Sequence, residues 1–276
     1  KILTDWNGLM IVALAKASQV FDEPEYSQAA SKAADFVLKS LRRPDGRLLH
    51  RFRDGNAGLP AHVDDYAFMI WGLLELYETD FRVDRLQTAL ELNALFLEHF
   101  WDSERGGFFF TADDAENLLM RKKEIYDGAV PSGNSVAALN LLRLGRMTAN
   151  TDLEKKAEQI GRTFSGNVKQ LPSAHTQLLL AIDFGLGPSN EVVVAGSPGG
   201  DDTVAMLKAL RKPFFPNKVV LFRPGGEPAP PIVGVAPYTA NQEGIDGKAT
   251  AYVCRGYNCE PPTTDPAKMV EVLSGK

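Results

Sequence analysis

Helical segments that restart about every sixty residues constrain this sequence more than any other feature. Apolar residues recur every three or four positions in segments that begin near residues 5, 64, 132 and 173. This spacing predicts amphipathic helices that come in pairs. A turn and a strand-like stretch follow the first two pairs, at Asp45-Gly46 and Gly106-Gly107. A repeated helical hairpin predicts a solenoid or a closed toroid.

The two helices of each predicted pair differ in character. The first is shorter and more evenly apolar, and it contains Gly8 in one pair and Gly72 in the next. The second carries a regular charged face, so we expect buried inner helices and solvated outer helices. A closed ring of six hairpins needs twelve helices, whereas this sequence predicts seven. The predicted fold class is therefore mainly α, an incomplete (α/α) toroid over residues 1–187.

The pattern changes at Gly187-Pro188. Two short apolar runs, at 191–195 and 218–222, predict buried strands, and the helical segment between them completes a β-α-β unit. A third strand is expected near 251–253, and a last helix near residue 265. The loop 196–200 is rich in glycine but lacks the spacing of a nucleotide loop, and we interpret it as a plain turn. Residues 188–276 are thus predicted to form a small α/β domain.

Composition excludes several classes of function. The net charge is −5 and no basic run offers a phosphate footprint, so no nucleic-acid partner is expected. No stretch approaches the roughly 20 apolar residues of a membrane span, so no membrane partner is expected. The chain opens within a helical pattern, so we expect its natural amino terminus to lie upstream. We expect a cytoplasmic location.

The two cysteines, Cys254 and Cys259, have neither the spacing of a redox motif nor that of a zinc site. Two reduced thiols and a small local disulfide both remain open, and we assign them no role. We expect no metal and no cofactor, because the sequence shows no cluster with ligand spacing.

Polar and aromatic residues gather just before each predicted inner helix. We call them the mouth residues, because in a ring of hairpins these positions surround the opening of the central cavity. They are Thr4, Asp5, Trp6 and Asn7, then His62, Asp64, Asp65 and Tyr66, then Glu124, Tyr126, Asp127, Ser132 and Asn134, and finally Ser173 and His175. Carboxylates, amides and flat aromatic rings are typical of a polyol-binding cleft.

Two reaction classes fit these residues. A glycosidase needs two carboxylates, and we expect Asp65 as the acid or base with Asp127 as its partner. A sugar isomerase or epimerase needs groups that titrate near neutrality, which favours His62 with His175. The expected substrate-binding residues are Trp6, Asn7, Tyr66, Glu124, Ser132 and Asn134.

Each of these residues also has a purely structural interpretation. Asp64 is a candidate helix cap, Asp127 a turn residue and Asn134 a cap or loop anchor. The rings of Trp6 and Tyr66 are candidates for the core. Two further histidines, His50 and His99, fall in an outer loop and on an outer helix, and we interpret them as structural or surface residues.

Four separated segments carry a family resemblance: KILTDWNGLM, LPAHVDDYAFMIWGLLELYE, KKEIYDGAVPSGNS and TAYVCRGYNCEPPTTDPAKMVEVL. Their order and spacing resemble the YyaL / spermatogenesis-associated protein 20 family, also described as thioredoxin-domain-containing proteins. The resemblance implies that a thioredoxin-like domain and the first hairpins of the toroid precede Lys1 in the intact protein. It also implies a relationship to sugar 2-epimerases and six-hairpin glycosidases.

The sequence therefore predicts a carbohydrate-active protein that isomerises, epimerises or hydrolyses a sugar or polyol. The alternative is a non-catalytic module that binds a glycan or peptide, or acts as a scaffold, beside the thioredoxin-like domain. Whether the chain is an enzyme stays open at this point.

Overall fold

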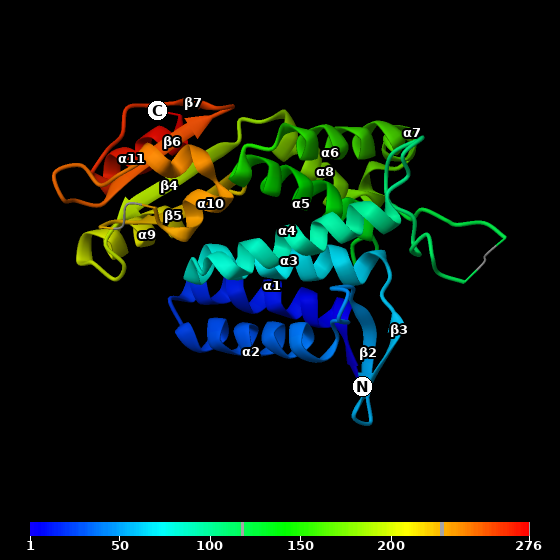
Figure 1. Cartoon of the computed structure of the whole chain (residues 1–276). Helices are drawn as coiled ribbons and strands as arrows, with labels where there is room; N and C mark the ends of the chain where they lie inside the picture. Colours follow the sequence, from blue (N-terminus) through cyan, green and yellow to red (C-terminus); the bar gives the residue numbers. More distant parts are fainter. Residues whose placement is uncertain (117–118, 227–228, 276) are drawn as a thin grey trace. The chain divides into compact units, whose positions relative to one another are not determined.

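A computed structural model of the chain describes residues 1–116, 119–226 and 229–275. The chain divides into two compact units (Figure 1). The helical unit comprises Lys1–Leu142 and Asp152–Ile182, and the α/β unit comprises Arg143–Thr151 and Asp183–Lys276. The second unit thus takes in residues 143–151 and 183–187, which the sequence analysis placed in the helical domain.

The helices follow the predicted pairing. The first pair is α1 (Thr4–Phe21) and α2 (Pro24–Ser40), the second is α3 (Val63–Asp80) and α4 (Val83–Phe100), and the third is α5 (Gly133–Thr148) and α6 (Thr151–Thr163). Then come α7 (Ser165–Gln170), the 3-10 turn η1 (Pro172–Ala174) and α8 (Thr176–Leu186). The short α7 was not predicted, and the predicted seventh helix is divided between η1 and α8.

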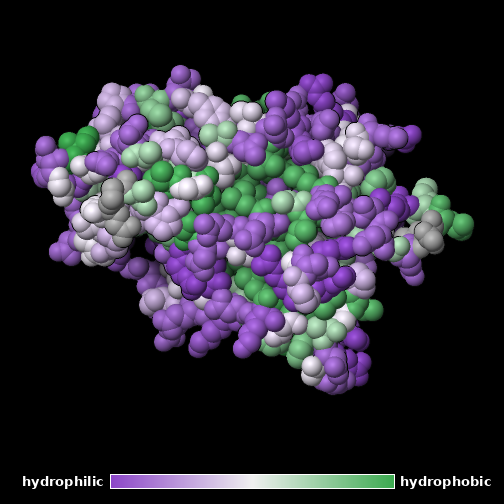
Figure 2. Space-filling model, viewed as in Figure 1, coloured by the Kyte–Doolittle hydropathy of each residue, from purple (hydrophilic) through white to green (hydrophobic). Residues whose placement is uncertain are grey.

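Inner and outer helices differ in burial as expected, but the inner helices are not shorter: α1 has 18 residues and α2 has 17, while α3 and α4 have 18 each. Helix α1 packs against both α2 and α3, and α3 is buried along most of its length. Two glycines allow this close approach: a Cβ on Gly8 would lie 2.7 Å from the backbone of Phe68, and one on Gly72 would lie 3.2 Å from the Gly8 carbonyl oxygen. Helix α2 buries only Ala30, Ala34 and Val37, and Figure 2 shows a largely hydrophilic surface over it.

A small antiparallel sheet adjoins the first hairpins. Its strands β1 (Ile2–Leu3), β2 (Leu49–Arg53) and β3 (Asn56–Pro60) lie in the order β1-β2-β3. The sequence predicted only half of this hairpin. The strand-like stretch predicted after Gly106-Gly107 does not form a full strand. An isolated bridge joins Phe108 to Trp101 there. The sheet places β2 beside the start of α1, where the Thr4 hydroxyl donates to the carbonyl oxygen of Leu49.

The α/β unit contains a four-stranded sheet in the order β5-β4-β6-β7. Its strands are β4 (Asn190–Gly196), β5 (Lys218–Pro224), β6 (Thr250–Arg255) and β7 (Asn258–Cys259), and its helical elements are α9 (Asp201–Arg211), α10 (Pro231–Val235), η2 (Pro237–Asn241) and α11 (Pro266–Ser274). Strands β4 and β5 are parallel, as a β-α-β unit requires. Cys254 and Cys259 pair across β6 and β7 and form a disulfide.

Over the described residues, we find no helix with both the length and the apolar character that crossing a membrane demands.

Candidate functional site at the starts of the inner helices

Buried carboxylates join the starts of the inner helices to one another. The carboxylate of Asp65, in the first turn of α3, accepts the backbone N–H of Asp5 at the start of α1, at 3.0 Å. The neighbouring Asp64 accepts the backbone N–H of Gly133, the first residue of α5. Adjacent residues of one helix therefore hold the helices on either side. Carboxylates suit this position because a helix start leaves backbone donors unsatisfied and carries a partial positive charge.

A third carboxylate makes the same kind of link to α8. Asp127 accepts the backbone N–H of Ser132 at 2.9 Å, and those of Gln177 and Leu178 at 2.9 and 3.1 Å. The expected partner of Asp65 in catalysis is thus a buried cap that secures α8 and the loop before α5. This geometry favours the structural interpretation of Asp127, because its two oxygens already accept three donors.

The carboxylate of Asp65 also holds His50, which the sequence led us to interpret as a structural or surface residue. Nδ1 of His50, on β2, lies 3.0 Å from each oxygen of Asp65. Because a carboxylate only accepts hydrogen bonds, Nδ1 of His50 carries the proton and its Nε2 keeps a lone pair when the ring is neutral. The hydrogen bond to Asp65 raises the pKa of His50.

The second imidazole of the site belongs to His62, which caps α3. His62 and Asp65 form a capping box, in which the carboxylate of Asp65 accepts the N–H of His62 at 2.8 Å and the ring of His62 faces the N–H of Asp65. The ring stacks on Phe110 and its centroid lies 5.3 Å from that of His50. Burial lowers the pKa of His62. The two rings, 23% and 35% exposed for His50 and His62, thus have pKa values shifted in opposite directions.

Asp64 is the third titratable group of the site. Burial first, and then the charge of Asp65, raise its pKa to about 7, although the hydrogen bond from Gly133 opposes the shift. The pKa of Asp5 is also raised, again by burial and then by Asp65. The sequence predicts Asp64 as a cap of α3 and Asp65 as the acid or base. In the structure it is Asp65 that caps α3, and Asp64 is the carboxyl whose pKa lies near neutrality. Asp65 completes the cap and is fully buried, while Asp64 is half-buried and titrates near neutrality.

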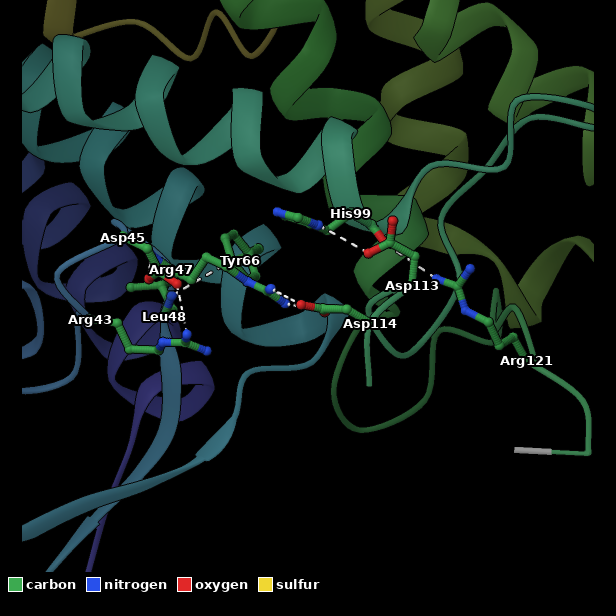
Figure 3. Close-up of polar contacts among 9 residues, drawn as sticks. All are labelled: Arg43, Asp45, Arg47, Leu48, Tyr66, His99, Asp113, Asp114 and Arg121. Carbon is green, nitrogen blue, oxygen red and sulfur yellow. Dashed lines mark hydrogen bonds and ion pairs between the residues drawn. The ribbon is translucent and has the colours of Figure 1, made fainter. Parts of the chain in front are cut away.

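Three expected substrate-binding residues turn into the protein instead. Tyr66 is 1% exposed, and its hydroxyl accepts the N–H of Leu48 at 3.1 Å (Figure 3). Asn134 is fully buried and uses its amide on the backbone of Phe108 and Glu124. Ser132 is buried, and its hydroxyl bonds that of Ser135 at 2.9 Å. We therefore assign these three to the scaffold, because their polar atoms are already paired inside the protein.

The remaining expected residues stay accessible. Trp6 is 63% exposed in the first turn of α1, which argues against a core role. Asn7 is half-buried and donates to the carbonyl oxygen of Leu3 at 2.7 Å. Glu124 is exposed and pairs with Lys122. Tyr126, also exposed, lies so close to Gly128 that a Cβ there would be 2.8 Å from its ring.

His175 does not join the other histidines. It is buried, and its Nδ1 lies 2.9 Å from the carbonyl oxygen of Ile125. The imidazole pair of the site is His50 with His62, rather than His62 with His175. A partial signal for His50 was present in the sequence, because it lies in the strand-like stretch after Asp45-Gly46, which becomes β2, the first strand of the hairpin before α3.

Two groups of side chains lie close enough to share a cation, with ligand atoms within 4.8 Å in the described part of the chain. One is His50, His62 and Asp65, and the other is His99, Asp113 and Asp114, of which Figure 3 shows the His99–Asp113 contact. In the first group, Asp65 already accepts two backbone N–H groups and the Nδ1 proton of His50. We therefore treat that group as a hydrogen-bonded network and assign it no metal.

The likeness to solved structures concerns the helical hairpins. A GH76 α-mannanase of Bacteroides thetaiotaomicron superposes with a TM-score of 0.51 at 16% identity, over 60% of this chain and 46% of that one. At this identity the likeness shows the fold alone. The chain carries part of an (α/α) toroid, followed by a small sheet region.

No family model matches the chain. Sequence relatives extend over almost all of it: spermatogenesis-associated protein 20 of Homo sapiens is 31% identical over 283 residues, and that of Rattus norvegicus is also 31% identical. Each match covers 99% of this chain and 36% of the relative, so the chain spans about a third of the length of these proteins. The relationship agrees with the family resemblance of the four segments, and the chain is homologous over 99% of its length to spermatogenesis-associated protein 20.

Proposed function

We propose that the helical unit acts on a sugar or polyol by proton transfer, as an isomerase or epimerase, with His50 as the base and His62 as the proton donor. One observation carries this proposal: a buried carboxylate, Asp65, holds Nδ1 of His50 while the ring of His62 lies 5.3 Å away. A base oriented by a buried carboxylate, next to a second group that donates a proton, is the arrangement such a reaction needs.

The chemistry follows from the two tautomers. His50 keeps a lone pair on Nε2, which removes the proton from the carbon beside a sugar carbonyl. His62 stays neutral because burial lowers its pKa. One of its ring nitrogens faces the backbone N–H of Asp65, so the other carries the proton, which is donated to the carbonyl oxygen. The product is an enediol. Return of the proton from His50 to the former carbonyl carbon, while the hydroxyl on the carbon that lost it gives its proton to His62, yields the isomer. Addition of a proton from water to the opposite face of the carbon that lost it, while the new hydroxyl returns its proton to His62 and His50 gives its proton to the resulting hydroxide, yields the epimer.

The mouth residues that stay at least partly accessible are suited to hold the substrate. Trp6 and Tyr126 present flat apolar rings, which stack on the C–H faces of sugars. Asp64, Glu124 and Asn7 offer polar atoms for sugar hydroxyls.

Hydrolysis of a glycosidic bond is the second candidate, and the carboxyl of Asp64 favours it. A pKa of about 7 keeps a carboxylic acid partly protonated at neutral pH, which is what a glycosidase requires of its general acid. The fold shared with an α-mannanase makes mannose-containing substrates the first to test. Because this chain spans about a third of the length of its relatives, we also propose, on the family resemblance alone, that a thioredoxin-like domain accompanies it in the intact protein. The cytoplasmic location stays a prediction from the sequence.

Solvent exchange tests the proposal without knowledge of the physiological substrate. The chain is incubated with mannose, glucose and cellobiose in D₂O, and deuterium at the carbon beside the carbonyl is measured by NMR. Release of reducing ends from mannan oligosaccharides is followed in parallel. We expect exchange that His50→Gln abolishes. Exchange that His50→Gln leaves intact contradicts the assigned base, and binding by calorimetry without exchange or hydrolysis favours a non-catalytic glycan-binding module.

The control for His50→Gln is His99→Gln. Nδ1 of His99 also lies 3.0 Å from a carboxylate oxygen, that of Asp113 (Figure 3). The pair lies at the end of an outer helix, away from the mouth residues in sequence, and Asp113 is exposed. The two substitutions therefore remove the same chemical group from the same kind of contact, and only His50→Gln should affect turnover.

A further inference from the structure

The α/β unit contains a cavity of about 450 Å³ that the proposed function does not use. The cavity lies where the parallel strands β4 and β5 end, and the loop before β6 closes its other side. In open α/β sheets, the carboxyl ends of parallel strands are the usual place for a ligand. The volume falls in the range of small-molecule sites.

Glycine supplies five of the nine lining residues, so few side chains give the cavity its chemistry. They are Ser197 after β4, Arg223 near the end of β5, and Glu243 and Lys248 in the loop before β6. Two cations face one acid. The lining of the cavity therefore carries a net positive charge in a chain whose net charge is −5.

The guanidinium of Arg223 is the central feature of this cavity. Its side chain is only 2% exposed, and its Nη2 donates to the carbonyl oxygen of Ala240 at 3.2 Å and to Glu243 at 3.0 Å. Its Nε is buried and has no hydrogen-bond partner among the described residues. A buried donor without an acceptor is costly, and more so on a charged group.

The acid that faces Arg223 is a weak counter-charge. Glu243 is 67% exposed, so water screens its carboxylate, and an ion pair of this kind contributes little. The start of α9 does not offer an alternative anion site, because the carboxylate of Asp202 already accepts the N–H groups of Thr203 and Ala249 there. The glycine-rich loop before α9 is thus a turn, as the sequence analysis expected, and the cation of the cavity comes from β5.

We propose that this cavity binds a small oxyanion, the carboxylate or phosphate group of a metabolite, with Arg223 as the principal ligand and Lys248 at the rim. A guanidinium pairs with either group through parallel N–H···O hydrogen bonds. Because Glu243 accepts from the same guanidinium, it competes with the anion for Arg223.

Calorimetric titration of the full chain tests this site, with inorganic phosphate and acetate as probes at constant ionic strength. Saturable binding of either probe is expected, and the probe that binds more tightly identifies the head group. Arg223→Gln should weaken binding roughly tenfold or more, which corresponds to the loss of a charge-assisted hydrogen bond. Lys248→Gln should weaken it about threefold, as expected for an exposed charge. Glu243→Gln should strengthen it, because the competing carboxylate is gone.

The matched control is Lys212→Gln, which removes an exposed lysine of the same unit outside the cavity and should leave binding unchanged. Circular dichroism shows whether each variant folds. If Arg223→Gln does not fold, the opposite effects of Glu243→Gln and Lys248→Gln decide. Absence of saturable binding of both probes contradicts the proposal, as do equal affinities in all variants or an equal loss in Lys212→Gln.

Discussion

Asp65 and Asp127 of the helical unit are buried carboxylates that backbone N–H groups satisfy, whereas Arg223 of the α/β unit is a buried guanidinium that protein acceptors satisfy only in part. Asp65 and Asp127 each accept two or more backbone donors. Arg223 uses one nitrogen on the protein and leaves Nε without a partner. We infer that the fully paired carboxylates serve as structural joints, whereas Arg223, which keeps an unpaired donor beside a cavity, serves as a binding group.

The residues of the candidate site also fall into two groups, fully paired carboxylates and partly exposed histidines. Asp65 and Asp127 join helices through buried hydrogen bonds. His50 and His62 are partly exposed, so their rings are available for chemistry. A carboxylate that is fully paired cannot also exchange protons with a substrate. It can still orient a neighbouring imidazole and stabilise that ring when it is protonated.

The largest expected effect is on turnover. His50→Gln removes the proposed base, and kcat/KM should fall by about 10²–10⁴, the usual contribution of general base catalysis. Steady-state assays on the sugar that shows exchange would measure this. A comparable fall in His99→Gln would mean that the loss does not come from the mouth.

Removal of the Asp127 carboxylate should have the next largest effect. Asp127→Ala leaves the N–H groups of Ser132, Gln177 and Leu178 without their acceptor, and should lower the free energy of unfolding by about 3 kcal/mol. Urea denaturation followed by circular dichroism measures the loss. The comparison variant is Asp152→Ala, whose exposed carboxylate pairs with Lys155 and which should cost less than about 1 kcal/mol. Equal losses would refute the assignment of Asp127 as a joint.

A smaller effect is expected from Gly8→Ala, because the new methyl group would meet the α3 backbone at Phe68 and Met69. We expect a loss of about 1–3 kcal/mol, the usual cost of overpacking. Gly166→Ala, on α7, is the control, since a Cβ there meets nothing within 4 Å. A thermal melt in which Gly8→Ala is as stable as Gly166→Ala would show that α1 and α3 are not in such close contact.

The last expected effect is a dependence of stability on pH, and it concerns Asp64. Its pKa is raised to about 7 in the folded state, from 3.8, so the folded chain holds this proton more tightly than the unfolded chain. Stability from this group is present at low pH and is lost as the pH rises from about 4 to about 7, with a slope of at most about 1.4 kcal/mol per pH unit. Asp64→Asn should lack this component. A difference between wild type and Asp64→Asn that does not change with pH would contradict the raised pKa.

The hairpins, the inner and outer faces and the β-α-β unit could be predicted because each depends on a local period of apolar residues. The positions of the mouth residues in the chain were predictable for the same reason: they precede the inner helices.

What each mouth residue does could not be predicted, because decisive partners are distant in sequence: Asp65 accepts from Asp5, 60 residues away, and Asp127 accepts from Gln177, 50 residues away. The exchange of roles between Asp64 and Asp65 depends on which carboxylate faces Asp5 and which faces Gly133. His50 was missed because its partner Asp65 lies 15 residues further along, beyond a hairpin of which the sequence showed only one strand. The unpaired Nε of Arg223 depends likewise on how the loop before β6 folds over β5.

The central claim is that Asp65 holds His50 and raises its pKa while burial lowers the pKa of His62, and an NMR titration of the histidines tests it most directly. The chain has four histidines, so their ring signals can be assigned by single substitutions. The pKa of His50 should lie above the ordinary value of 6.5 and that of His62 below it. In Asp65→Asn, the pKa of His50 should fall. Equal pKa values for His50 and His62, or a His50 value that Asp65→Asn leaves unchanged, would contradict the account.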